Sequence, residues 1–157
     1  MNSIKKIFSN RTMIRKIFLM VLFAFSVFVL NAQDPSLTVI ANSKGAPAEL
    51  KFAELKSILK GEKQRWPDGT KILICLMKTN TAAGTTTSRK VYNMSGDDVN
   101  KFWLALVFQG KAPAPSFFNS MSELETFVAQ NSGAIGVVTQ TTGTEAKTIS
   151  IDGKKTF

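Results

Sequence analysis

The segment of residues 78–89 carries the side chains best suited to chemistry in this sequence. Lys78 follows a buried apolar run, a stretch of small and hydroxyl-bearing residues comes next, and Arg89 closes the segment. Backbone N–H groups at a helix start point toward an anion, hydroxyls add donors, and an arginine fork can bind two oxygens. The segment therefore predicts binding of a small oxyanion. A Thr-rich stretch is also typical of a solvated connection between a strand and a helix, and this alternative stays open.

The candidate anion contacts come from this segment and from one earlier loop. They are Lys78, Gly84, Thr85, Ser88 and Arg89, with Ser43 as an addition from the loop after the first predicted strand. The crevice beyond the carboxyl ends of strands is where α/β folds place their ligands. We therefore expect the ligand at such a crevice.

Catalytic chemistry has few candidates in this chain. It contains no histidine, which removes Ser-His-Asp and Cys-His catalysis together with the commonest metal ligand. The acid pairs Asp97 with Asp98 and Glu123 with Glu125 each fall in the first turn of a predicted helix, where capping and the helix dipole account for them. We therefore expect a protein that is not an enzyme and that has no metal and no cofactor.

Cys75 is the single cysteine, so no intramolecular disulfide can form. It lies in the apolar run of residues 72–77, where a cysteine behaves as a small buried hydrophobe. A reactive thiol is the alternative, but no neighbour in the sequence would lower its pKa. We expect a buried, inert thiol.

The first 32 residues differ in composition from the rest of the chain. A basic start is followed by an apolar run over residues 17–30 and by Asn31 and Ala32, which is the order of a secretory signal peptide cleaved after Ala32. A transmembrane anchor is the alternative, although the run is shorter than the roughly 20 residues of a spanning helix. Residues 33–157 then form one domain that is exported, to the periplasm or beyond.

The net charge of +9 comes in large part from this leader, which holds five of the 20 basic residues and none of the acidic ones. Residues 33–157 keep 15 basic against 11 acidic residues, a net charge of +4. The cations are scattered rather than clustered with aromatic residues, so nucleic acid is not an expected partner. A mildly basic surface does favour small anions.

Hydrophobic periodicity predicts alternating strands and helices after residue 33. Apolar runs predict strands over residues 37–40, 72–77, 134–138 and 148–151. Helical spacing predicts a helix from Phe52 to Gly61, a second helix capped by Ser95, and a third opened by a capping box over residues 122–125. The pattern indicates an α/β domain in which a small mixed sheet is flanked by helices.

The remaining segments are expected to be irregular or to pack in a simple way. Residues 78–88 are predicted to form a hydroxyl-rich loop that runs into a short helix through Val91, Tyr92 and Met94. The apolar stripe of Val99, Phe102, Trp103 and Leu106 has helical spacing and indicates a core-facing surface. Residues 111–118, which contain prolines, are predicted to form a loop, and the tail from Gly153 is expected to be loosely held.

Three segments carry a family resemblance. Residues 55–70 resemble the pattern L-x-x-I-F-x-G-K-x-x-x-W-x-x-G of the phosphate-binding components of ABC importers, the PstS-like family of the type 2 periplasmic binding protein superfamily. The hydroxyl-rich segment before Tyr92 agrees in order and spacing, and residues 122–138 look like the pattern V-x-x-x-P-G-A-I-G-Y-V. Together they cover most of residues 50–140.

The resemblance implies a short member with one of the family's two lobes, and a solute-binding-like function with phosphate or a similar oxyanion as ligand. The family's anion motif R-x-x-x-S-G-T corresponds either to Lys78 with Ala83, Gly84 and Thr85, or to Thr86, Thr87 and Ser88 before Arg89. A membrane transporter or an envelope protein would be the partner.

The alternative is a non-catalytic envelope accessory protein that kept this fold without the ligand. Its interaction surface would comprise Trp66 and residues 111–118, because exposed aromatic residues often anchor protein interfaces.

Overall fold

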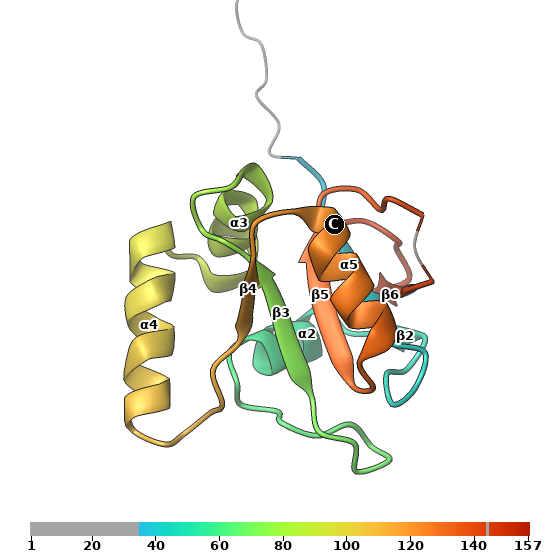
Figure 1. The fold of residues 1–157 in the computed structure, drawn as a ribbon, viewed down its shortest axis with the longest axis horizontal. Coiled ribbons are helices and arrows are strands. Elements are labelled where there is room, and N and C mark those ends of the chain that lie inside the picture. The colour runs from blue at the N-terminus through green and yellow to red at the C-terminus, as the bar shows by residue number, and fades with distance from the viewer. Residues whose placement is uncertain (1–34, 144) are drawn as a thin grey trace, which may run out of the picture. The chain divides into compact units, whose positions relative to one another are not determined.

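Six strands of the computed structural model form one mixed sheet in the order β2, β6, β1, β5, β3, β4 (Figure 1). The structure describes residues 35–143 and 145–157. The strands are β1 (Thr38–Ala41), β2 (Glu49–Leu50), β3 (Leu73–Met77), β4 (Ser116–Phe118), β5 (Ala134–Val138) and β6 (Lys147–Ile151). β1 is antiparallel to both its neighbours, whereas β3 is parallel to β4 and β5, and β2 is parallel to β6.

Helices cover both faces of this sheet. They are α2 (Phe52–Leu59), α3 (Ala82–Thr87), the π-helix η1 (Ser88–Tyr92), α4 (Gly96–Phe108) and α5 (Met121–Gln130). Figure 1 shows α5 and α2 on opposite faces. The predicted fold class, a small mixed sheet flanked by helices, is confirmed.

Strand alternation divides the core into two clusters. Ile74 and Leu76 of β3 face the cluster that contains α2, η1 and α4, whereas Cys75 and Met77 face the cluster that contains α5. Side chains of successive strand residues point to opposite faces of a sheet. The continuous apolar run in β3 therefore reflects burial on both sides, which is typical of parallel strands.

Trp66 belongs to the first of these clusters. Its side chain is only 2% exposed, and its indole N–H donates to the carbonyl of Gly133 at 3.0 Å. Trp66 is thus a core residue, and the part of the predicted interaction surface that depended on it is wrong. The predicted stripe on α4 does face the core, since Val99 and Trp103 are buried and Phe102 and Leu106 pack against the cluster.

The connection after β3 is shorter than predicted. Only residues 78–81 are irregular, and α3 begins at Ala82 with Thr81 as its N-cap. Hydroxyl-rich residues were expected to form a loop, but Thr86 and Ser88 donate to the helix carbonyls of Ala82 and Gly84 at 2.9 and 2.8 Å. This back-bonding lets hydroxyl residues lie within a helix.

Three further segments depart from the predictions. The proline-containing loop over residues 111–118 ends in β4, which pairs with β3. Ser120, and not Ser122, caps α5 by accepting from the Glu123 N–H at 3.3 Å. The tail is also held in place, because Phe157 exchanges two backbone hydrogen bonds with Leu37 at 2.9 and 3.0 Å.

Glu125 consequently does not lie in the first turn of α5. Its side chain is fully buried, and its carboxylate accepts from the Thr142 N–H at 2.9 and 3.0 Å and from the Thr142 hydroxyl at 2.6 Å. Charge-assisted hydrogen bonds of this kind satisfy a buried carboxylate. Glu125 therefore fastens the loop between β5 and β6 to α5, so helix capping does not account for it.

The predicted signal peptide, residues 1–32, and its apolar run lie outside the described residues. Among the helices within residues 35–143 and 145–157, none has the length and apolar character that a membrane span requires.

Cys75 is predicted to stay unreactive while the protein is folded. Its side chain is fully buried, and burial raises the pKa of the thiol from 9.0 to about 12. Because the thiolate is the reactive form, a thiol reagent at neutral pH should label the denatured protein quickly and the native protein at a negligible rate. Equal labelling rates in the two states would contradict this burial.

The same thiol should make stability depend on pH in the alkaline range. Its pKa is higher in the folded protein, at about 12, than the ordinary value of 9.0, so the folded state keeps a proton that the unfolded state has lost. The contribution is fully present below about pH 9 and declines as the pH rises toward the folded pKa. Urea unfolding of the wild-type protein and of Cys75→Ala across this range measures the difference.

Candidate functional site

Three parallel strands end at one edge of the sheet, where α3 lies in Figure 1. Register pairs Leu73 with Ala134, and Met77 with Phe118, so β3, β4 and β5 finish together. An open groove of about 440 Å³ lies at this edge and is lined by Lys78, Thr79, Asn80, Asp97, Asn100 and Phe117. This is the crevice beyond the strand carboxyl ends in which α/β folds place ligands.

Lys78 and Gly84 meet at this edge. A Cβ atom on Gly84 would lie 2.0 Å from the carbonyl oxygen of Lys78, so only glycine lets α3 approach the end of β3 this closely. The hydroxyl of Thr85 donates to the carbonyl of Thr79 at 3.0 Å. The structure thus brings Lys78, Gly84 and Thr85 together, as in the first of the two predicted registers. Of the three, only Lys78 lines the groove, and the Thr85 hydroxyl already donates to a backbone carbonyl.

The residues of the second predicted register, Thr86, Thr87 and Ser88, lie inside the helical segment of α3 and η1. Ser88 is 2% exposed, and its hydroxyl donates to the Gly84 carbonyl at 2.8 Å. Thr86 is buried as well and donates to the Ala82 carbonyl. Thr87 is buried too, and its hydroxyl has no hydrogen-bond partner among the described residues. Hydroxyls that donate to backbone carbonyls inside a helix are not available as donors to a ligand in the groove. The prediction that Ser88 contacts the same anion as Lys78 therefore does not fit this geometry.

Arg89 faces a different groove from Lys78. It is exposed, and it lines an open depression of about 810 Å³ together with Asn93, Met94, Ser95, Asp98, Lys101 and Phe102. No residue lines both this depression and the groove of Lys78. The sequence places Lys78 and Arg89 at the two ends of one segment, and the helical turn between them separates their side chains.

Ser43 lies at the opposite end of the sheet. β1 is antiparallel to β5 and pairs its last residue, Ala41, with Ile135 near the start of β5. The neighbouring Lys44 carbonyl accepts from the Gly133 N–H at 3.2 Å. Ser43 therefore cannot contact an anion that Lys78 holds. The prediction grouped the two residues because the direction of β1 is not evident from its apolar pattern.

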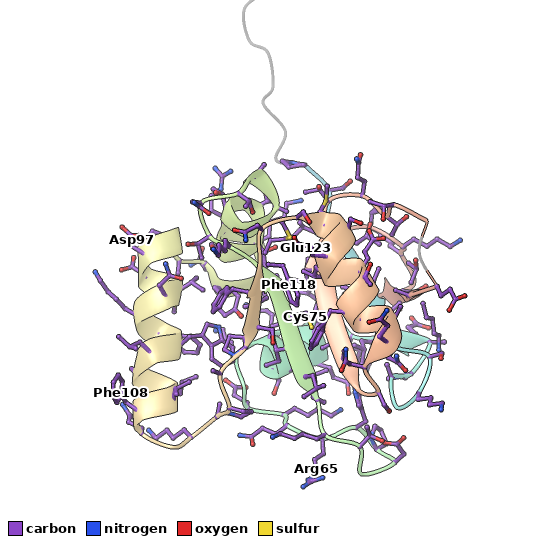
Figure 2. The ribbon with its side chains drawn as sticks, in the orientation of Figure 1. Arg65, Cys75, Asp97, Phe108, Phe118 and Glu123 are labelled. Atoms are coloured by element: carbon purple, nitrogen blue, oxygen red, sulfur yellow. The ribbon has the colours of Figure 1, made fainter. Side chains whose placement is uncertain are left out.

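The groove contains groups that the sequence did not single out. The side-chain amide of Asn100, from α4, donates to the Thr79 hydroxyl at 3.1 Å. Figure 2 shows Asp97 at the end of α4 that lies beside the finishing edge of β3 and β4. Thr79 and Asn80 were within the predicted segment, but Asn100 and Asp97 reach the groove only through the packing of α4.

The electrostatics of this groove are mixed. Lys78 supplies a positive charge and Asp97 a negative one, and both side chains are exposed. Water screens exposed charges, so each contributes modestly to the field that a bound ion would experience. Within the described residues, no three His, Cys, Asp or Glu side chains are grouped as a metal site would require.

No family model and no curated protein matches the sequence. Solved structures match the fold. An ABC-type phosphate transport receptor from Vibrio cholerae aligns with a TM-score of 0.61 and 17% identity, covering 78% of this chain and 48% of that one. PstS from Borrelia burgdorferi aligns with a TM-score of 0.57 and 14% identity, covering 76% of this chain and 48% of that one.

The match extends over most of this chain and about half the length of each receptor. The motifs in residues 55–70 and 122–138 predicted this likeness, together with its restriction to one lobe. The chain therefore has the fold of about half of a PstS-type phosphate transport receptor.

Proposed function

We propose that this chain is an exported, solute-binding-like protein that holds a small oxyanion, phosphate or one of similar shape and charge, in the groove beside Lys78. The observation that supports this most is the position of an exposed lysine at the carboxyl edge of β3, in one groove with the amides of Asn80 and Asn100. An ammonium and amide N–H groups are donors that a tetrahedral oxyanion accepts. The likeness of the fold to phosphate transport receptors agrees with this ligand class.

The proposed binding is weak for a physical reason. The groove is open to water, and Asp97 lines it together with Lys78. An exposed charge pair at about 4 Å contributes only about 1 kcal/mol in water.

The similar receptors are about twice as long as the matched part of this chain. A membrane transporter or another envelope protein is therefore the proposed partner that would cover the open side.

Two charge changes in the groove, with a control at the other end of β3, test this function. Lys78→Gln should weaken phosphate and sulfate binding about five-fold, the equivalent of about 1 kcal/mol, and Asp97→Asn should strengthen it by a similar factor. Lys71→Gln is the matched control, since Lys71 is an exposed lysine at the other end of β3. Isothermal titration calorimetry at low and moderate salt measures all four proteins. Equal losses in Lys71→Gln and Lys78→Gln, or no saturable heat in the wild-type protein, would contradict the proposal.

An accessory protein that has lost the ligand is the second candidate. It is favoured by exposed apolar side chains on α4, where Leu104 is 59% and Phe108 is 81% exposed. Trp66 no longer contributes to such a surface, because it is buried. Absence of phosphate and sulfate binding in the titration would favour this candidate.

A further inference from the structure

An apolar groove runs between α4 and the edge strand β4. It has a volume of about 310 Å³ and is lined by Asn100, Trp103, Leu104, Val107, Ala114, Pro115 and Phe117. No side chain in this lining is charged. Leu104, Val107 and Phe117 are 59%, 40% and 37% exposed. The groove therefore suits an uncharged, apolar segment and disfavours a charged one.

The strand beside this groove has a free edge. β4 is the last strand of the sheet and pairs only with β3. The Lys78 N–H donates to the Phe118 carbonyl at 2.9 Å, so the backbone groups of Phe118 point toward β3 and those of Phe117 point away from it. Among the described residues, no strand pairs with the side of β4 that faces away from β3. An extended chain can pair with such an edge.

The apolar groove continues into the groove of Lys78. Asn100 and Phe117 line both of them. A bound segment would thus meet apolar side chains along β4 and an ammonium group at the end of the strand. A free carboxylate at the end of an apolar peptide has the charge complementary to Lys78, whereas Asp97, which lines the same groove, repels it.

The direction of β4 selects the end of that peptide. β4 runs toward the edge at which Lys78 follows β3, so a chain parallel to β4 would bring its C-terminus to Lys78. We propose that this groove binds the C-terminal segment of a partner protein as an added parallel strand, with apolar side chains on α4 and the terminal carboxylate at Lys78. The proposal rests on the same lysine as the proposed oxyanion function.

Three ligands separate the two proposals. They are a fluorescent apolar hexapeptide with a free C-terminal carboxylate, the same peptide with a C-terminal amide, and inorganic phosphate. The acid should bind at least five-fold more tightly than the amide, and phosphate should displace the acid. In Lys78→Gln the difference between acid and amide should disappear.

Two variants of α4 form a matched pair for the apolar part. Leu104→Asp should weaken binding of both peptides at least ten-fold while phosphate binding stays unchanged. Phe108→Asp introduces the same charge at an exposed residue that does not line the groove, and it should leave both peptides unaffected.

The outcomes are distinct. Phosphate binding without peptide binding, or equal affinity for acid and amide, would overturn the peptide proposal and leave the oxyanion function intact. Preference for the acid that Lys78→Gln removes, without any phosphate binding, would overturn the oxyanion function and support the peptide proposal.

Discussion

Gly84→Ala is expected to destabilise the protein by about 3 kcal/mol, at the upper end of the range for overpacked sites. The new Cβ would lie 2.0 Å from the carbonyl oxygen of Lys78 and 2.9 Å from that of Met77. Both are backbone atoms, so no change of rotamer relieves the contact, and α3 must move away from β3. Urea unfolding followed by circular dichroism measures the loss.

This prediction is sharp because helix propensity alone predicts the opposite sign. In a helix, alanine is about 1 kcal/mol more favourable than glycine. A variant more stable than the wild-type protein would show that α3 does not pack on Lys78 as described. Ala82→Gly, at an exposed position in the same helix, is the control and should cost only about 1 kcal/mol.

Tyr92→Phe is expected to destabilise the fold by about 3 kcal/mol, because it leaves two buried groups without partners. The indole N–H of Trp103 donates to the Tyr92 hydroxyl at 3.1 Å, and that hydroxyl donates to the carbonyl of Leu59. The three residues lie on α4, η1 and α2, so one hydroxyl connects three helices. Thermal and urea unfolding measure the change.

A double-mutant cycle separates this network from simple packing. Trp103→Phe removes the other donor, so the double variant should be less destabilised than the sum of the two single changes. Strictly additive losses would contradict a coupled network.

The elements that were predicted correctly have local causes. Ser95 caps α4 because its hydroxyl accepts from the Asp98 N–H at 3.2 Å, a contact between residues three apart. The apolar run of β3 and the helical spacing of α2 are also local patterns, and burial preserves both. A sequence contains these signals in full.

Two of the features that were missed depend on distant partners. β4 is three residues long and exists because β3 supplies its hydrogen bonds. Glu125 resembles a capping acid in the sequence, but Thr142 in a later loop determines its role. No local pattern contains such information.

The candidate site was predicted in part for the same reason. Lys78, Gly84 and Thr85 are close in sequence and meet at one edge, whereas Ser43 required knowledge of the direction of β1. Arg89 required knowledge that residues 82–92 are helical, which turns its side chain into another depression. Asn100 and Asp97 enter the groove only because α4 packs beside residue 79.

The most direct test of the central claim, that the groove beside Lys78 holds the oxyanion, is an NMR titration of the protein with phosphate, followed on its backbone amides. The account predicts saturable shifts at Lys78, Thr79 and Asn80 and none at Ser43 or Lys71, at the opposite end of the sheet. Shifts confined to the Ser43 loop or to the depression of Arg89, or no shifts at all, would contradict it.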